Sequence, residues 1–360
     1  MAKLKVGHIG WLSRDEGPDC QTVAWCDVRE DKMKSAAQQH PDITMYTDWR
    51  RMVEHPGLDL VCISTPNWLH TDMACAFLEA GVHVFVEKPM SINRQELDRL
   101  LVTQKKSGKH LCVDFEMRVS PAVRRIKAIL DGGEIGQLRR IELVHHRGGW
   151  LEEGNGIWRT RTDRSGGHFL MEPIHMIDIF RCLAGEIKAV QSTSGPNVLK
   201  NYGDFPDNLF TNLFFEDGTL ATILTSHTLS AQTRDPNRWA RLGHDMYMVF
   251  TGTGGSLMVD FINPRILVVR NEDYPAGAQG TRVVFSREED YSAGDDYHGF
   301  FHDITLMRRT FISRCAAGQP PVQDALDAWK THLVCLAAEE SSKTDFRRIE
   351  IDYALPKELR

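Results

Sequence analysis

The sequence lacks several features that mark whole classes of protein. No apolar run approaches the roughly 20 residues that a membrane-spanning helix needs, so we expect no membrane partner. No basic surplus is present, because 43 lysines and arginines face 49 aspartates and glutamates, which argues against nucleic-acid binding. Internal repeats are missing, and a 42% hydrophobic content excludes a disordered chain. For 360 residues, two globular domains are expected.

Paired cysteines are missing too. The eight cysteines are scattered without a C-x-x-C pair, which favours buried reduced thiols over disulfides. Neither they nor His145, His146 and His168 have a compact ligand spacing, so we expect no metal. The first residues lead into a strand-like segment instead of an apolar signal region, and the sequence therefore favours a cytoplasmic protein.

Short apolar runs alternate with helical patterns in the first third of the chain. The predicted strands are Leu4–Ile9, Thr22–Val28, Leu58–Ser64, Val82–Val86 and His110–Val113, and the predicted helices are Glu30–Gln39, Thr71–Ala80 and Arg94–Lys106. Continuous apolar strands between helices indicate a parallel sheet covered on both faces. This is the doubly wound, Rossmann-type architecture of nucleotide-binding domains.

The rest of the chain changes character. After a basic helix, Val123–Leu130, it carries eight polar-alternating strand candidates between Leu138 and Phe285, and then the helices His298–Ala316 and Asp324–Ser342. We therefore predict an α/β protein with a Rossmann domain over 1–120 and a substrate-binding and oligomerisation domain over 121–321. The second domain is α+β, with a large, mainly antiparallel, open-faced sheet. A helix over 322–343 is expected to pack back on the first domain, and 344–360 to form a C-terminal strand or tail.

The segment after the first strand departs from the dinucleotide-binding pattern. Of the three glycines that let the backbone approach a pyrophosphate, only Gly10 is in place, with Leu12 and Asp15 at the other two positions. Few residues remain before the second strand, so the first helix is either a stub or replaced by a remodelled loop. Backbone N–H groups after Gly10, assisted by Ser13, are the candidates for holding the pyrophosphate.

Three other strand ends carry polar residues, at the edge where open α/β sheets bind ligands. Asp27 is placed to bind the adenosine ribose, which favours NAD over NADP, although Arg29 nearby weakens this preference and a helix N-cap is the alternative role. The remaining cofactor candidates are Ser64, Thr65, Pro66, Asn67, His70, Glu87 and Lys88. Pro89 ends its strand and leaves Lys88 at the cleft, where an ammonium group can stabilise a developing alkoxide.

These motifs, in their order along the chain, resemble the glucose–fructose oxidoreductase, inositol 2-dehydrogenase and MocA (Gfo/Idh/MocA) family over nearly the whole length. The matching segments are Thr65-Pro66-Asn67-x-x-His70, Glu87-Lys88-Pro89, Gly133-Glu134-Ile135-Gly136, Ser165-Gly166-Gly167, His175-x-x-Asp178, and Phe311-Ile312 through Gly318-Gln319-Pro320-Pro321 to Asp324-Ala325-Leu326. Each motif is weak alone, whereas the ordered set is specific.

The resemblance implies a nicotinamide-dependent oxidoreductase acting on sugars or cyclic polyols, with Lys88 beside the reacting hydroxyl and His175 as general base. An imidazole suits this role near neutral pH, although a core histidine is the alternative. The family commonly has an aspartate four residues before that histidine. Here the position is Met171, and Glu172, one residue off, either replaces the aspartate or serves another role.

The expected substrate contacts extend beyond Lys88 and His175. Trp150 and Trp158 suit the apolar face of a sugar ring, and Arg118, Arg159 and His168 suit its hydroxyls, with surface-loop decoration as the alternative. Besides an NAD-dependent dehydrogenase, two functions stay open: redox-neutral, NAD-assisted glycoside cleavage or elimination, and sugar binding without catalysis. A half-apolar sheet face is normally covered, so we expect a dimer or tetramer that associates through the large sheet.

Overall fold

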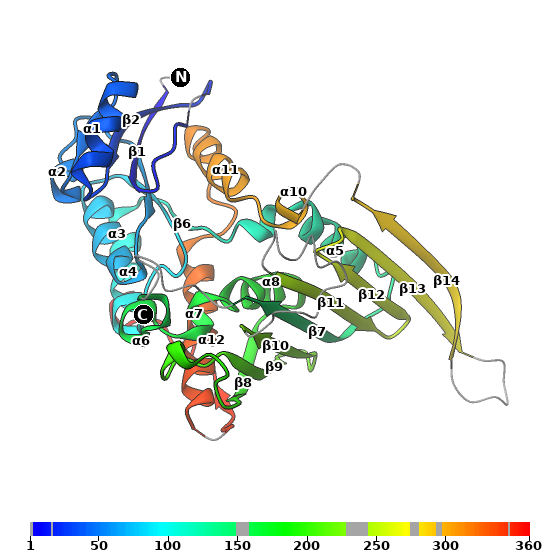
Figure 1. Cartoon of the computed structure of the whole chain (residues 1–360). Coiled ribbons are helices and arrows are strands. Elements are labelled where there is room, and N and C mark those ends of the chain that lie inside the picture. Colours follow the sequence, from blue (N-terminus) through cyan, green and yellow to red (C-terminus); the bar gives the residue numbers. More distant parts are fainter. Residues whose placement is uncertain are drawn as a thin grey trace.

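The computed structural model describes residues 3–15, 17–148, 158–227, 244–273, 281–292, 297–344 and 346–360. Two sheets, connected by helices, form the molecule (Figure 1). The first is a parallel sheet in the order β3-β2-β1-β4-β5-β6. Its strands are β1 (Leu4–Gly10), β2 (Cys20–Cys26), β3 (Thr44–Tyr46), β4 (Leu60–Ser64), β5 (His83–Val86) and β6 (Leu111–Val113). The predicted Rossmann-type sheet is confirmed.

Four helices accompany this sheet: α1 (Glu30–Gln39), α2 (Trp49–Val53), α3 (His70–Glu79) and α4 (Arg94–Ser107). Three of them coincide with predicted helices to within one residue at each end. The sequence analysis did not predict β3 or α2, because segments of three and five residues are too short to show a period. Asn93 caps α4 by accepting a hydrogen bond from the Glu96 N–H at 3.0 Å, and Gly108 ends it in the left-handed region.

The connection between β1 and β2 contains no helix in its described residues, 11–15 and 17–19. Parallel neighbours normally need a dozen or more residues and a crossover helix. Here the sheet face that bears Val6, Cys62 and Phe85 is covered by Met307 and Phe311 of α11 (Ile304–Ala316). Of the two predicted possibilities, a stub helix or a remodelled loop, the described residues have the loop. A helix from the far end of the chain covers this face of the sheet (Figure 1).

The second sheet has the order β14-β13-β12-β11-β7-β10-β9-β8-β15. Its strands are β7 (Leu138–Arg147), β8 (Ile187–Ser194), β9 (Asn208–Phe215), β10 (Leu220–Ser226), β11 (His244–Gly252), β12 (Gly255–Asp260), β13 (Arg265–Asp273), β14 (Thr281–Asp290) and β15 (Ile349–Glu350). Pairing is antiparallel except between β7 and β10. Alternate residues, such as Leu213 and Ile223, are fully buried, whereas Leu220 and Leu224 are exposed, so one face is open as predicted.

The remaining helices place the second domain against the first. They are α5 (Pro121–Asp131), α6 (Thr162–Ser165), α7 (His168–Met171), α8 (Ile174–Ala184), α10 (Tyr297–Phe301) and α12 (Ala325–Ser342). The single helix predicted over His298–Ala316 is wrong, because Asp303 starts a new helix, α11, by accepting a hydrogen bond from the Leu306 N–H at 3.0 Å. No helix of the described chain is long and apolar enough to span a membrane.

Helix α12 packs against elements of both domains. Its Trp329 donates a hydrogen bond to Asp98 of α4 at 2.7 Å, and its His332 accepts one from the Met90 N–H at 2.9 Å. On the other side, Thr331 donates to Asp178 of α8 at 3.0 Å. The turn that carries Lys88 is thus held in place by a helix more than 200 residues further along the chain.

Candidate active site

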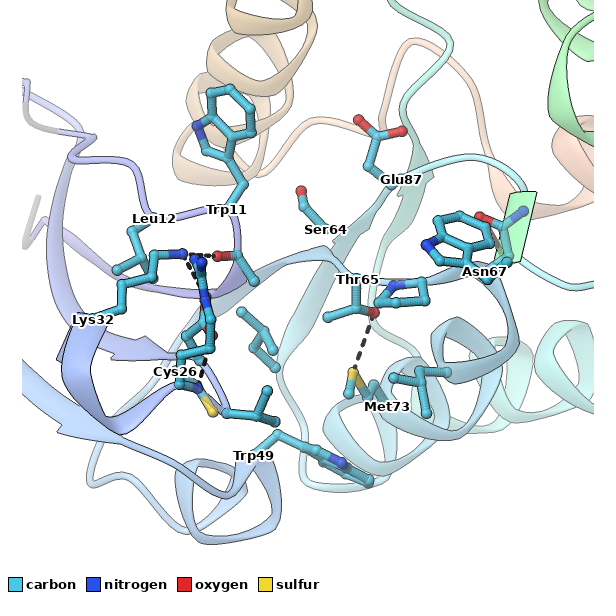
Figure 2. A pocket seen from close by; sticks show the side chains of 18 of the residues that line it. Trp11, Leu12, Cys26, Lys32, Trp49, Ser64, Thr65, Asn67, Met73 and Glu87 are labelled. Carbon is cyan, nitrogen blue, oxygen red and sulfur yellow. Dashed lines mark hydrogen bonds and ion pairs between the residues drawn. The ribbon is translucent and has the colours of Figure 1, made fainter. Parts of the chain in front are cut away.

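A cavity of about 860 Å³ lies at the carboxyl ends of β1, β2, β4 and β5 (Figure 2). It contains most of the cofactor residues that the sequence predicted. Those lining it are Gly10, Asp27, Arg29, Ser64, Thr65, Pro66, Asn67, Glu87 and Lys88, joined from the second domain by Trp158, Arg159 and Met171. The predicted strand ends therefore meet at one place, as the topology of a parallel sheet requires.

Gly10 occupies a position that only glycine fits. Its φ is +85°, and a Cβ atom added there would overlap the carbonyl oxygen of Ser64 on the neighbouring strand. The close approach of β4 and the turn after β1 therefore require glycine here, which is the role of the first glycine in the dinucleotide-binding pattern, and Gly10 itself lines the cavity.

Asp27 lies at the end of β2 with both carboxylate oxygens engaged. One accepts a hydrogen bond from the Arg29 N–H at 3.0 Å, and the other pairs with the ammonium group of Lys32, which also donates to the Gly10 carbonyl at 2.8 Å. Burial alone would raise the pKa of Asp27, but the bonds from Lys32 and Arg29 outweigh it and lower the pKa. The carboxylate stays ionised and can still accept ribose hydroxyls through its remaining lone pairs.

The sequence analysis missed Lys32, although its place in the first turn of the helix after Asp27 was a usable signal. Figure 2 shows its side chain reaching across the end of the cavity. A roomy cavity, a glycine at the end of β1, a carboxylate at the end of β2 and a lysine between them suit a dinucleotide. No helix begins in the described part of the β1–β2 connection, so this connection offers phosphates no helix N-terminus there.

A second cavity, of about 380 Å³, adjoins the first, since Glu87 and Lys88 line both. Lys88 donates a hydrogen bond to the Met171 carbonyl, which fixes the ammonium group between the two domains. The other residues lining this cavity are Glu116, Met117, His145, Arg147, Glu172, His175, Met176, His302 and Ile304. The structure therefore brings Lys88, Glu172 and His175 together.

His175 begins α8 with its imidazole at the cavity wall. Burial lowers the pKa of this group well below its usual value, and the charges of Lys88 and His302 lower it further. The ring is consequently neutral near pH 7 and able to accept a proton. Its Nδ1 lies 3.5 Å from a carboxylate oxygen of Glu116.

Glu172 pairs with Arg147 of β7. Burial favours the neutral acid, but the charges of Arg147 and Lys88 outweigh it and lower the pKa of Glu172 to about 2. The group is thus a permanent anion that neutralises Arg147. This pairing favours the second of the two roles left open for Glu172, because the carboxylate that faces His175 belongs to Glu116.

Two predicted cofactor residues do not line the cavities. The Ser13 hydroxyl accepts a hydrogen bond from Arg308 of α11 at 2.9 Å, so it faces the helix that covers the sheet. His70 is fully buried, with its ring nitrogens 2.7 Å from the carbonyl oxygens of Pro89 and Thr65. Polar residues at a strand end were predicted to meet the ligand, but these two hold the loops that surround it.

Two predicted substrate residues are likewise committed elsewhere. The Arg118 guanidinium pairs with Asp178 and Asp327, which lock η2 (Glu116–Val119) to α8 and α12. His168 is fully buried, with Nε2 at 3.2 Å from the Thr225 hydroxyl. Neither side chain lines the two cavities described above. Trp150 lies outside the described residues.

Sequence reasoning missed Glu116 and His302 of the second cavity, whereas the segment that begins at His145 was expected to line the cleft. Glu116 follows β6 within three residues, so the rule of strand ends applied to it. His145 and Arg147 end β7, whereas His302 stands between two helices that were predicted as one. Pattern alone gives no sign that His302 reaches this site.

One group among the described residues has the composition of a metal site: His8, Asp15 and Cys62 offer ligand atoms within 4.8 Å of one another. Arg308 already pairs with Asp15 at 2.9 Å. A guanidinium bound to the only carboxylate of the group opposes a second cation there. We therefore assign this group to the packing of α11 and not to a metal.

Two family models match the chain. "Oxidoreductase family, NAD-binding Rossmann fold" matches residues 8–115, and "GFO/IDH/MocA C-terminal domain" matches residues 123–258. Similar proteins include a myo-inositol 2-dehydrogenase of Thermotoga maritima, 26% identical over 94% of each chain. A 2,7-anhydro-N-acetylneuraminate hydratase of Mediterraneibacter gnavus is 27% identical over 74% of this chain and 67% of its own.

Among solved structures, levoglucosan dehydrogenase in complex with NADH superposes with a TM-score of 0.78 over 98% of this chain and 100% of its own. At 21% identity this is a likeness of fold. The two family models together span more than half of the chain and confirm the resemblance drawn from its ordered motifs. The chain therefore belongs to the Gfo/Idh/MocA oxidoreductase family, whose first domain is an NAD-binding Rossmann fold.

Proposed function

We propose that the protein is an NAD-dependent dehydrogenase that oxidises a hydroxyl group of a sugar, cyclic polyol or glycoside. One observation carries the proposal: Lys88 of the first domain and His175 of the second line one cavity, and that cavity adjoins the dinucleotide cavity through Glu87 and Lys88. A cation and a neutral imidazole at the junction of the two cavities are the groups that alcohol oxidation needs.

The residues divide the work as follows. His175, neutral because it is buried, accepts the hydroxyl proton. Lys88 has donors beyond the one bound to Met171, and these stabilise the developing alkoxide. Asp27 holds the ribose, and Gly10 leaves room for the phosphates. The cofactor, when bound, supplies the acceptor for a hydride.

The part of the first cavity that the second domain lines suits a ring-shaped polyol. Trp158 lines it, and the Arg159 guanidinium lies 4.9 Å above the centre of that indole. An aromatic face beside a cation and several donors matches a sugar, which has an apolar ring face and polar edges. The names of the relatives, myo-inositol 2-dehydrogenase and levoglucosan dehydrogenase, support this substrate class.

The test is turnover by the purified protein. We expect reduced nicotinamide to accumulate when NAD⁺ is mixed with one member of a panel of inositols, hexoses and anhydrosugars. Lys88→Met should abolish this signal while NAD⁺ still binds, whereas Lys105→Met, on the exposed side of α4, should behave as wild type. Absence of turnover across the panel, with NAD⁺ bound, would contradict the proposal.

A second candidate is redox-neutral chemistry, in which the hydride returns to the product. The relative named as a hydratase supports keeping it in view. Product analysis of the same panel separates the two functions: consumption of substrate without reduced nicotinamide indicates the redox-neutral reaction. Calorimetry with NAD⁺ tests the sugar-binding alternative, which predicts no cofactor binding.

We also propose that the protein is a homo-oligomer assembled through the open face of the large sheet. Apolar side chains follow one another across neighbouring strands on that face. Phe210 is opposite Leu224 in the register, Leu224 is opposite Val144, and Val249 is opposite Met258. Exposed apolar patches of this kind normally mark an interface.

A further inference from the structure

Glu116 stands between two histidines in the second cavity. One of its oxygens lies 3.5 Å from Nδ1 of His175, and the other lies 3.2 Å from Nε2 of His302. The side chain of Glu116 is 2% exposed and that of His302 is 27% exposed. A buried carboxyl group therefore lies between the imidazole at the reaction site and a partly exposed imidazole.

Glu116 supplies the carboxyl group beside the imidazole that the sequence around His175 lacks. Met171 stands where a carboxylate four residues earlier would orient the imidazole, and Glu172 is committed to Arg147. Glu116 comes instead from η2 (Glu116–Val119) of the first domain. Because Nδ1 faces Glu116, the ring geometry leaves Nε2 of His175 for the substrate.

We propose that Glu116 is a positioning residue that holds His175 and relays its proton to His302. The proposal rests on the dehydrogenase function proposed above. Neither the contact between Glu116 and His175 nor the one between Glu116 and His302 is an aligned hydrogen bond in this structure. Catalytic hydrogen bonds are often long without substrate and shorten in the ternary complex.

The proton balance is as follows. The substrate O–H bond breaks, and its proton binds Nε2 of His175. The Nδ1 proton of His175 passes to the Glu116 carboxylate, the carboxyl proton passes to Nε2 of His302, and His302, whose side chain is 27% exposed, loses one proton to water before the next turnover. The electron pair of the substrate C–H bond leaves as hydride to NAD⁺, so one proton is released for each hydride transferred.

The surroundings of Glu116 set the pH at which this relay operates. Burial raises the pKa of Glu116 to about 8, the charge of Glu87 adds to this rise, and Lys88 opposes it. The titratable and charged groups that face Glu116 from the elements around it are Glu87 and Lys88 after β5, Asp114 after β6, His145 and Arg147 of β7, Glu172, His175 and Asp178 at α8, and His302 after α10. Only the carboxylate form accepts the proton of His175, so turnover should rise with pH through about 8.

The experiment compares wild type with Glu116→Gln, Glu116→Ala and His302→Gln. For Glu116→Gln we expect kcat to fall by about 100-fold with an unchanged Kd for NAD⁺, and the rise of kcat with pH to disappear. Formate should restore part of the activity of Glu116→Ala, since it supplies a carboxylate to the vacated space. His302→Gln should lower kcat less, because water can replace a terminal group.

A second readout needs no turnover. In the NMR spectrum of ¹⁵N-histidine-labelled protein, Glu116→Gln should shift the tautomer balance or the titration of His175. If Glu116→Gln shifts His175 in this way while wild type shows no turnover, the dehydrogenase proposal is contradicted and the positioning role of Glu116 is not. If Glu116→Gln keeps wild-type kcat, pH profile and His175 resonances, or formate leaves Glu116→Ala inactive, Glu116 is not the relay. Should Glu116→Gln fail to fold, His302→Gln with wild-type kcat would overturn the relay.

Discussion

Asp27 and Lys32 illustrate how single residues set the charge at one end of the first cavity. The carboxylate alone favours the ribose hydroxyls of NAD, whereas Lys32 and Arg29, both bound to it, add positive charge at the same place. Because the pKa of Asp27 is lowered, its charge is constant across the neutral pH range. Preference between NAD and NADP therefore depends on the balance of these charges and not on protonation.

Asp27→Asn tests this balance. Loss of the anionic acceptor should weaken NAD⁺ binding about tenfold, equivalent to about 1.4 kcal/mol, since hydrogen bonds to charged groups are the stronger ones. NADP⁺ binding should tighten, because Lys32 and Arg29 lose their partner and remain available to a phosphate. Calorimetric Kd values for both cofactors provide the measurement, with Asp42→Asn, at an exposed site, as the matched control. Equal NAD⁺ affinity in wild type and Asp27→Asn would contradict this prediction.

Cavity-lining residues were predictable where the chain's topology dictates their position. Asp27, Asn67 and Lys88 follow parallel strands, and such strand ends converge whatever the rest of the sequence does. His70 and Arg118 looked equally suitable, but each is consumed by a distant partner that no local pattern reveals: Pro89 for the former and Asp178 for the latter. Polar residue type predicts a site only when its partners are known.

At the scale of elements, the exchange of one helix for another is the main departure from expectation. α11 takes the place of a crossover helix, and its Arg308 reaches Asp15 at 2.9 Å, while His8 lies 3.2 Å from the same carboxylate. Strand and helix positions followed from local periodicity. The substitution of α11 did not, because it depends on contacts between residues about 300 positions apart.

Arg308→Met should therefore destabilise the protein strongly. It leaves the Asp15 carboxylate buried without its cation, and breaking a buried pair costs about 3–5 kcal/mol. The double variant Arg308→Met/Asp15→Asn removes the unpaired charge and should recover a large part of the loss. Urea unfolding of both variants and of wild type measures the difference. Equal stability of single and double variants would show that the ion pair does not hold the loop.

A second element-scale prediction concerns Glu339 of α12. Its carboxyl group accepts a hydrogen bond from the Phe169 N–H at 2.5 Å, and burial raises its pKa from 4.5 to about 7, against the opposing effects of Phe169 and Lys343. A pKa raised on folding stabilises the protein fully below pH 4.5, and the contribution is lost as pH rises through about 7. Wild type should therefore lose stability across this window.

Glu339→Gln keeps the acceptor for Phe169 but cannot ionise. Relative to this variant, wild type should lose about 2–3 kcal/mol of unfolding free energy between about pH 5 and about pH 8, because each pKa unit is worth about 1.4 kcal/mol. Urea midpoints at the two pH values provide the measurement. Parallel pH dependence in the two proteins would mean that the carboxyl group is already ionised below pH 5.

For the whole molecule, the cleft between the domains and the open sheet face lie apart. α12 bonds to Met90, two residues after Lys88, and to Asp178, three residues after His175, and Lys88 and His175 line one cavity. The sheet lies on the other side of the second domain, extending to β14 away from the Rossmann domain (Figure 1). Association through that face would leave the entrance of the first cavity accessible to cofactor.

The last prediction tests that association. Wild type should have a solution mass that is a multiple of the 40.9 kDa chain. Leu224 and Met258 lie on the open face, are 38% and 43% exposed, and belong to apolar rows that cross several strands. Replacing both with glutamate buries two charges in any interface there, which costs far more than it does in water, so Leu224→Glu/Met258→Glu should be a monomer. Val322→Glu, at a site with 42% exposure outside the sheet, should keep the wild-type mass, and a wild-type monomer at micromolar concentration in light scattering would contradict the proposed assembly.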